Sequence, residues 1–323
     1  MFWPGFDSDR VRKNFLSAER FMECCDQVWS TDRRSSRITD RRRPESGSIV
    51  YAKRDHAAHL FQQLKRRRNR VVLVTSESDD GVEPSEVIPA QIAAWFSTNT
   101  THQGVQPLPL GLGNSYCRVT AKADLLADLS GREKKSLLYV NFRPETNPLI
   151  RRSLWESFGS SDWEGCCTRH AGNVSQEEYV SSMSSHRFVL CPRGNGIDTH
   201  RMWEALYLGT IPVVKYHPAL ASFHDLPILF VDVLEGLAPG FLEAKYQEMF
   251  QNKWNWEKLF MPWWREQFLK AGQKIHSQVP WSEYFKCRLP GRSDNNAKSE
   301  QSENWAARKA PQRRGFDASQ IQT

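Results

Sequence analysis

The chain has 323 residues, of which 39% are hydrophobic and 25% are charged. This length predicts about two domains of ~150 residues each, and the composition is typical of a soluble globular protein. Because no window approaches the ~18 consecutive apolar residues of a membrane span, the sequence excludes a transmembrane helix. The net charge of +7, from 44 basic and 37 acidic residues, favours anionic partners.

Basic residues gather in three runs, at 33–43, 65–70 and 308–314. Such runs usually form solvated surfaces or loops. The seven cysteines show no CxxC spacing, so we expect reduced thiols rather than a zinc site. The first residues lack the pattern of a secretory signal peptide. We therefore expect a cytoplasmic protein without a membrane span.

Helices and strands alternate along the first half. In chain order, the apolar spacing predicts a helix over 8–28, a strand over 48–53, a helix over 56–68, a strand from 71, a helix around 88–96 and an extended segment over 105–114. The run Val71–Val74 has no polar residue, as expected for a strand buried on both faces. An acidic loop follows this strand.

The alternation restarts after Lys135. The second half predicts a strand over 136–142, helices over 147–158 and 175–184, a strand over 187–192, a helix over 198–209, strands over 210–214 and 226–233, and a helix over 253–272 kinked at Pro262. Pro148 suits the first position of its helix, after Asn147 as N-cap. Ser175 and Glu178 form a capping box.

This pattern predicts mostly parallel α/β sheets in two halves. We predict an N-terminal, acceptor-side domain over 1–130 and a C-terminal, nucleotide-sugar-binding domain over 131–290. Residues 291–323 are polar and lack apolar periodicity, so they predict a disordered tail.

The segment Cys191–Val214, CPRGNGIDTHRMWEALYLGTIPVV, places a polar turn between a buried strand and a helix. Ligands of such sheets bind beyond the carboxyl ends of the strands. Gly194 and Gly196 let the backbone approach a ligand, and the helix N-terminus favours a phosphate. Arg193 and Arg201 supply forked donors for phosphate oxygens. The turn is therefore predicted to hold a diphosphate and a ribose.

Glu204 lies three residues after Arg201 on the following helix, and both lie off the apolar face that runs from Met202 to Gly209. We predict that Glu204 accepts hydrogen bonds from ribose or sugar hydroxyls. The alternative is a surface ion pair between Arg201 and Glu204. The segment matches neither the P-loop nor the complete GxGxxG pattern, since Thr199 stands where the third glycine would be.

The same stretch resembles the exostosin-type glycosyltransferases of family 47. The resemblance is carried by Pro192-Arg193-Gly194, Arg201, Glu204-Ala205-Leu206 and Ile211-Pro212-Val213-Val214, and it extends more loosely from about Val71 to about Val233. It implies a GT-B fold, in which two Rossmann-like α/β domains face each other across a cleft. It also implies transfer of a sugar from a nucleotide donor to a hydroxyl acceptor on a glycan or other molecule, in many members with inversion and without a metal. No cofactor is expected, because the nucleotide sugar is the donor substrate.

The predicted catalytic residues are Asp79 and Arg193. The predicted nucleotide-sugar-binding residues are Arg143, Gly194, Asn195, Gly196, Asp198, Thr199, His200, Arg201 and Glu204. Inversion needs a general base near the acceptor hydroxyl, and the loop after Val71–Val74 offers Glu77, Asp79 and Asp80, of which we choose Asp79. His102 and His170 are lesser candidates, and Asn141 is expected to face the cleft beside Arg143.

Two other functions fit parts of the sequence. A non-enzymatic protein could bind nucleotides or nucleic acid through its arginine runs. That hypothesis explains the charge but not the Cys191–Val214 turn, so nucleic acid is not the predicted partner. A transferase homologue that binds a nucleotide without turnover is the other alternative. The sequence specifies neither the donor, the acceptor nor the oligomeric state.

Overall fold

The computed structural model describes residues 6–29, 44–65, 68–117, 120–171 and 174–278. These residues belong to one compact unit within Met1–Val279. The predicted tail and the basic runs at 33–43 and 308–314 lie outside the described residues, as does part of the run at 65–70.

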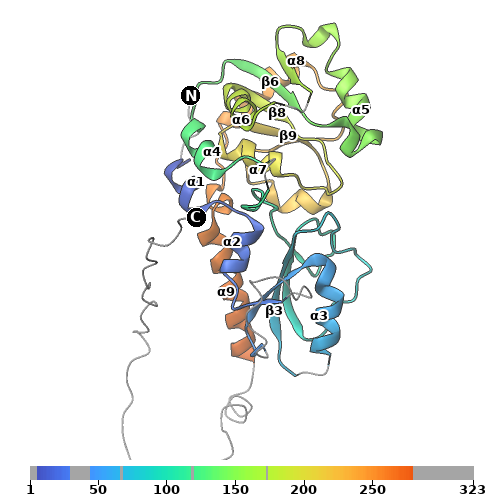
Figure 1. Cartoon of the computed structure of the whole chain (residues 1–323), viewed down its shortest axis with the longest axis vertical. Coiled ribbons are helices and arrows are strands. Elements are labelled where there is room, and N and C mark those ends of the chain that lie inside the picture. The colour runs from blue at the N-terminus through green and yellow to red at the C-terminus, as the bar shows by residue number, and fades with distance from the viewer. Residues whose placement is uncertain (1–5, 30–43, 66–67, 118–119, 172–173, 279–323) are drawn as a thin grey trace, which may run out of the picture. The chain divides into compact units, whose positions relative to one another are not determined.

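Within the described residues, ten strands form two sheets, and every pairing between neighbouring strands is parallel. The first sheet has the order β1-β2-β3-β4-β5, with bounds Gln27–Trp29, Ile49–Lys53, Val71–Ser76, Ile92–Ser97 and Gln106–Pro107. The second has the order β10-β9-β8-β6-β7, where β6 to β10 are Ser136–Asn141, Cys167–His170, His186–Leu190, Ile211–Lys215 and Leu229–Val231. The predicted architecture of two parallel α/β sheets, as in a GT-B fold, is confirmed (Figure 1).

Helices connect and cover these strands. The α-helices α1 to α9 are Asp9–Asn14, Ala18–Glu23, Ala57–Leu64, Ala123–Leu129, Pro148–Ser157, Gln176–Ser185, His200–Tyr207, Pro239–Phe250 and Met261–Gln278. Short 3-10 helices span Arg54–His56, Pro144–Thr146, Ser161–Trp163, Pro218–Phe223 and Trp256–Leu259. Within the described residues, no helix is both long enough and apolar enough to cross a membrane.

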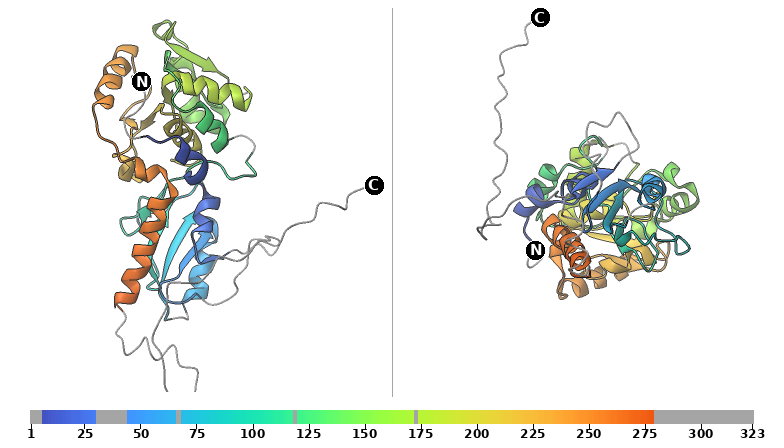
Figure 2. Two further views of the ribbon diagram at one scale, coloured as in Figure 1. Left: turned by 90° about the vertical axis from the view of Figure 1, so that its left-hand side faces the viewer. Right: turned by 90° about the horizontal axis from the view of Figure 1, so that it is seen from below.

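The first sheet is covered on both faces, because alternate residues of a strand point to opposite sides. Val50 and Ala52 of β2 belong to the core cluster that includes residues of α3. Ile49 and Tyr51 belong to the larger cluster, which includes residues of α2 and α9 and continues through the second sheet. Figure 2 shows α9 running alongside the first sheet, which it contacts at β2, β3 and β4.

The predicted kink at Pro262 is wrong. The segment is instead two elements, the 3-10 helix Trp256–Leu259 and the helix α9, which begins at Met261. Pro262 therefore lies in the first helical turn, where a backbone N–H has no partner to lose. Aromatic side chains of this region pack in the core, since Trp256, Phe260 and Trp264 are buried.

The predicted helix around 88–96 is also wrong, because Ile92–Ser97 forms strand β4. Its pairing with β3 and the hydrogen bond from Trp95 Nε1 to Thr75 Oγ1 (2.8 Å) hold it in the sheet. A short apolar run does not distinguish a buried strand from a helix, and long-range pairing decides the outcome.

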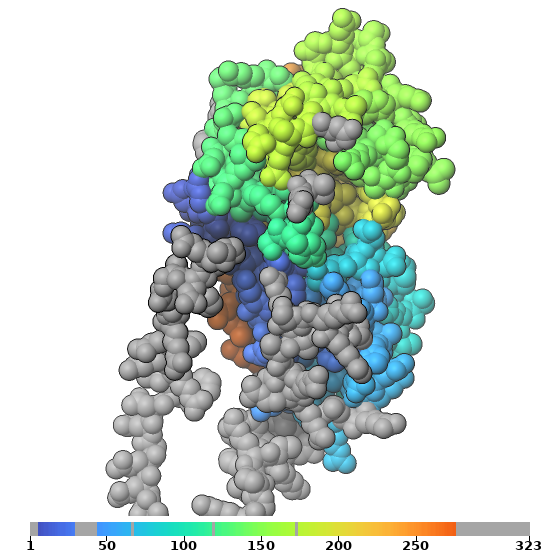
Figure 3. Space-filling model, viewed as in Figure 1, coloured from blue at the N-terminus to red at the C-terminus, as the bar shows by residue number. Residues whose placement is uncertain are grey.

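The predicted helix over 8–28 is divided into α1, α2 and the strand β1. The break follows from long-range contacts, because the Leu16 N–H donates to Tyr207 Oη (2.9 Å) and the Leu112 N–H donates to the Leu16 carbonyl (2.7 Å). Ser17 then caps α2 by accepting from the Arg20 N–H. In Figure 3 the blue N-terminal segment borders the green segment with α4, which α1 contacts.

The chain changes direction in the second sheet between β6 and β8. From β6 it passes to β7 on one side and then to β8 on the other. Ligands of open α/β sheets bind at such a switch point, beyond the carboxyl ends of the two strands. The boundary predicted near residue 130 stays a prediction. Helix α4, which precedes it, packs against α6 and α7.

Replacing Phe268 of α9 by alanine should lower the free energy of unfolding by about 3–5 kcal/mol, as truncation of a core Phe does. Phe268 is fully buried and its ring meets those of Phe21 and Phe96. Urea denaturation measures the effect. Leu269→Ala is the matched control, because its side chain is 46% exposed. Equal losses for both variants would contradict the packing of α9 on the first sheet.

Candidate active site

The guanidinium of Arg151 on α5 holds the turn after β8 in shape. It donates to three backbone carbonyls, from Nε to Arg193 (2.9 Å), from Nη2 to Pro192 (3.1 Å) and from Nη1 to Arg143 (3.3 Å). The side chain is buried, and burial lowers the pKa of Arg151 to about 10, with the nearby charge of Arg201 acting in the same direction. Arg151 therefore joins the exits of β6 and β8 at the switch point.

Asn147 supports the same turn from the start of α5. It occupies the predicted N-cap position, but its side chain makes no cap bond and instead donates to the Gly194 carbonyl (2.9 Å). A Cβ on Gly194 would lie 3.3 Å from Arg151 Nη2. Glycine at 194 therefore permits close packing against Arg151 as well as the predicted approach of a ligand.

Asn99, at the end of β4, ties the turn to the loop after β3. Its Nδ2 donates to the Asp79 carbonyl (3.2 Å), and its Oδ1 accepts from the Asp198 N–H (2.8 Å). A Cβ on Gly196 would lie 3.0 Å from Asn99 Nδ2 and 3.2 Å from Asp79 Oδ1. Glycine at 196 therefore permits this close contact, a role that the sequence pattern did not reveal.

The carboxylate of Asp198 makes a second tie between these segments. It accepts from the Leu110 N–H (2.9 Å) and from Trp203 Nε1 (2.8 Å). Burial raises the pKa of Asp198 to about 7, although hydrogen bonds from Leu110, Trp203 and Thr199 act in the opposite direction. The predicted ligand contact of Asp198 stays a prediction, since these bonds already engage its carboxylate.

A cleft of ≈ 360 Å³ lies between the turn and the loop after β3. It is lined by Glu77, Ser78, Asp79, Leu110, Thr146, Gly194, Asn195, Gly196, Asp198, Thr199 and His200. The structure thus brings the predicted base together with six of the predicted binding residues. His200 is fixed at its edge, because Nδ1 donates to the Gly111 carbonyl (2.8 Å).

Glu77 is the most constrained acidic residue in the cleft. Its backbone has φ of 61°, a left-handed conformation that is uncommon outside glycine. Its carboxylate accepts from Tyr51 Oη (3.1 Å), Asn114 Nδ2 (3.0 Å) and Tyr116 Oη (2.9 Å). Because three donors already engage this carboxylate, its position is fixed.

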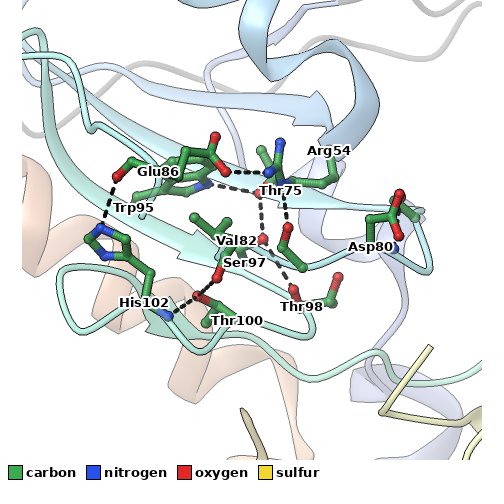
Figure 4. A network of polar contacts seen from close by, with 12 residues as sticks. Arg54, Thr75, Asp80, Val82, Glu86, Trp95, Ser97, Thr98, Thr100 and His102 are labelled. Carbon is green, nitrogen blue, oxygen red and sulfur yellow. Dashed lines mark hydrogen bonds and ion pairs between the residues drawn. The ribbon is translucent and has the colours of Figure 1, made fainter. Parts of the chain in front are cut away.

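Asp79, by contrast, is exposed to the cleft. Within the described residues, its carboxylate has no hydrogen-bond or ion-pair partner. The loop that carries it is held by the network of polar contacts in Figure 4. Arg54 donates from Nε to the Gly81 carbonyl (3.1 Å) and forms an ion pair with Glu86, whose carbonyl His102 also contacts.

Glu204 does not lie on the surface, so the alternative of a surface ion pair with Arg201 is wrong. Its side chain is only 2% exposed. Oε1 accepts from the Ala121 N–H (2.8 Å) and Oε2 from Tyr179 Oη (2.7 Å). All residues of α7 from Met202 to Tyr207 are buried, because strands and helices surround it.

Arg201 has a guanidinium nitrogen that lacks a hydrogen-bond partner within the described residues. This nitrogen, Nε, is buried. Burial acts to lower the pKa of Arg201, but Tyr179, Cys191 and Glu204 together raise it, so the guanidinium stays charged. Asn141 at the end of β6 likewise has a buried Nδ2 without a partner among the described residues.

Four further candidates do not line the cleft, namely Arg143, Arg193, His102 and His170. Arg143 is exposed beside the turn, with its carbonyl held by Arg151. Arg193 is exposed, donates to the Asn195 carbonyl (2.7 Å) and lines a neighbouring pocket instead of the cleft. His170 contacts Tyr139 Oη (3.2 Å).

Sequence reasoning missed Arg151 and Asn99 as site residues. Neither belongs to a motif, and each acts through backbone groups far away in sequence. The six described cysteines form no disulfide. Nor do three or more His, Cys, Asp or Glu side chains gather as a metal site in the portion of the chain that is described.

The Exostosin GT47 domain matches residues 52–226, which is more than half of the chain and includes β3, the cleft and all of α7. The chain belongs to the exostosin GT47 family. It is therefore a glycosyltransferase, and the turn after β8 lies within the family's domain.

Two solved structures are similar to this exostosin-family chain. AviGT4, a glycosyltransferase involved in avilamycin A biosynthesis, aligns with a TM-score of 0.40 and 13% identity over 72% of this chain and 75% of its own. An α1,3-fucosyltransferase with GDP aligns with a TM-score of 0.37 and 12% identity over 81% of this chain and 98% of its own. No curated protein sequence matches the chain.

The raised pKa of Asp198 predicts a pH dependence of stability. Because the folded state holds this proton up to about pH 7 and an ordinary Asp releases it near 3.8, the free energy of unfolding should fall as pH rises between these values. Urea denaturation from pH 4 to 8 tests this. In Asp198→Asn the contribution should vanish, whereas Asp232→Asn, at an exposed position, should keep it. Parallel curves for wild type and Asp198→Asn would contradict the assignment.

Glu204→Gln should lower the free energy of unfolding by about 1–3 kcal/mol, because it disturbs two buried hydrogen bonds. Tyr179→Phe removes the partner of Oε2, and the double variant should lose less than the sum of the two single losses. Thermal and urea melts measure this, with the exposed Glu177→Gln as control. Unchanged stability would contradict these buried hydrogen bonds and would support the predicted role of Glu204 as an acceptor for ribose hydroxyls.

Proposed function

We propose that this glycosyltransferase uses a nucleoside diphosphate sugar as donor and transfers the sugar to a hydroxyl acceptor with inversion and without a metal ion. The observation that carries the proposal is the charged guanidinium of Arg201 at the switch point, whose buried Nε has no hydrogen-bond partner within the described residues. Removing a charge from water is costly unless it is paired, so this position favours an anionic ligand.

The electrostatics around Arg201 suit a diphosphate. Arg151 and Arg201 are close enough for the charge of Arg201 to lower the pKa of Arg151. Glu204 is the carboxylate that acts on Arg201, and Arg143 is exposed beside the turn. The N-terminus of α7 adds a partial positive charge where the helix begins at His200. A diphosphate would offset this excess of positive charge.

The same groups would stabilise the leaving group. During transfer the bond between the anomeric carbon and the β-phosphate oxygen breaks, and negative charge develops on the departing diphosphate. Arg201 and the α7 N-terminus are preorganised to stabilise that charge, and such electrostatic stabilisation usually lowers the barrier more than any other effect. In our proposal these groups take the part that a divalent ion plays elsewhere. Arg193 is not assigned to this step, because it lines the neighbouring pocket instead of the cleft.

Asp79 is proposed as the general base. Its free carboxylate lies opposite Gly196, within the cleft that the turn also lines. In the proposed step the acceptor oxygen attacks the anomeric carbon, the acceptor proton passes to Asp79, and the nucleoside diphosphate leaves. Glu77 is the weaker candidate because three donors already engage its carboxylate.

Separate assays of nucleotide binding and of sugar transfer distinguish the proposed roles of Arg201 and Asp79. Arg201→Gln should weaken binding of UDP or GDP, whichever binds the wild type, by about tenfold or more, because a charge-assisted bond contributes roughly 1.5–3 kcal/mol. Asp79→Asn should leave binding intact and slow nucleotide release in the presence of acceptor by ~10²–10⁴. Isothermal titration and a nucleotide-release assay with a panel of nucleotide sugars and acceptors measure the two effects.

Asp80→Asn is the matched control, since the neighbouring residue is also exposed but does not line the cleft. Failure of every nucleotide to bind would overturn the donor assignment. Equal transfer by Asp79→Asn and Asp80→Asn would overturn the base. Loss of activity in EDTA that manganese restores would overturn metal independence.

A further inference from the structure

A second pocket lies on the other side of the turn. Its volume is ≈ 290 Å³, and Arg193 and Ile197 form the part of its wall that the turn supplies. Other residues of the same turn line the cleft described above, namely Gly194, Asn195, Gly196 and Asp198. The two cavities therefore share a wall, but no residue lines both of them.

The walls of this pocket are largely apolar. They include Leu149, Ile150, Leu154, Ile197, Val214 and Leu234. Leu149 is 95% exposed, and Tyr216 at the same pocket is 42% exposed. Apolar side chains left uncovered at the edge of a cavity favour a ligand with an apolar surface of its own.

Basic side chains at the pocket can donate hydrogen bonds into the same space. They are Arg193, Lys215 at the end of β9 and His217 just beyond it. His217 Nδ1 accepts from the Ala219 N–H (3.2 Å), so the neutral ring carries its proton on Nε2 and remains a donor there. Glu235 is the one carboxylate among the described residues that line the pocket, and Ser153 Oγ donates to it (3.5 Å).

The charges at the pocket indicate a single negative charge on its ligand. Arg193 and Lys215 are cations and Glu235 is an anion, which leaves one net positive charge when His217 is neutral. Burial and the nearby Arg193 lower the pKa of His217, whereas Glu83 acts to raise it. The direction of the shift agrees with a positive potential in the pocket.

We propose that this pocket binds a carboxylate carried on an apolar body, such as an aryl or alkyl acid, at a site separate from the nucleotide cleft. The fork of Arg193 matches the two oxygens of a carboxylate, and Lys215 and His217 Nε2 provide further donors. The apolar walls take the aryl or alkyl part. This binding goes beyond the proposed sugar transfer and is tested without it.

Isothermal titration with 3-phenylpropanoate, and with its neutral isostere 3-phenylpropanamide, tests the proposal on the full chain. The acid should bind saturably and at least about tenfold more tightly than the amide, because a charge-assisted contact is lost in the amide. Lys215→Gln should weaken binding of the acid by about tenfold. Leu149→Asn should weaken it by about fivefold through lost apolar contact. Both side chains are exposed, so both variants should fold.

Arg152→Gln is the matched control, because Arg152 is an exposed cation on α5 that does not line the pocket. It should bind the acid as the wild type does. In NMR titrations the pKa of His217 should rise when the acid binds, because a carboxylate favours the protonated ring. Saturating UDP or GDP should not displace the acid.

Four results would overturn the proposal. They are absence of saturable binding, equal affinity for acid and amide, wild-type affinity in both pocket variants, and competition by the nucleotide. Tighter binding of 3-phenylpropyl phosphate than of the acid would overturn the assignment of a single negative charge. None of these outcomes depends on whether the protein transfers sugar, so failure here and failure of the proposed function are distinguishable.

Discussion

The site depends on one buried guanidinium, that of Arg151. A turn between a strand and a helix leaves several carbonyl groups without partners, and buried carbonyls must be satisfied. Arg151 satisfies three of them at once and links the exits of β6 and β8. Its planar fork can do this where a lysine could not, because it presents five donors in a fixed geometry. The shape of the turn at the switch point follows from this clamp, and the other contacts of the site are built on that shape.

The turn is also tied to the first sheet through backbone groups. Asn99 and Asp198 form hydrogen bonds across the cleft, and His200 donates to the Gly111 carbonyl. These bonds set how closely the loop with Asp79 approaches the turn, and Gly196 leaves the necessary space. The geometry of the cleft therefore depends on hydrogen bonds between polar groups of the protein itself.

Positive charge is concentrated at the switch point, and the protein's own groups compensate this charge only in part. Arg151 is satisfied by neutral carbonyls, whereas Arg201 keeps a buried Nε without a partner within the described residues. Glu204 is already engaged by Ala121 and Tyr179, so it stabilises the surrounding segments as well as the charge of Arg201. Burial makes these interactions stronger than they would be in water, and it also makes an unpaired charge costly.

The amino-acid sequence by itself determined the α/β class, most strands and the chemical character of the turn. These features follow from local patterns, such as the apolar run Val71–Val74, the cap at Ser175 and the glycines and arginines after β8. Sequence reasoning failed at Ile92–Ser97, because a short apolar run fits a helix or a strand until its neighbour is known. It failed at Glu204, because helical spacing identifies one apolar face but cannot show that α7 is enclosed on all sides. The roles of Arg151, Asn99 and Asp198 were decided only by the tertiary structure, since each bonds to backbone groups between 8 and 99 residues away and those groups carry no sequence signature.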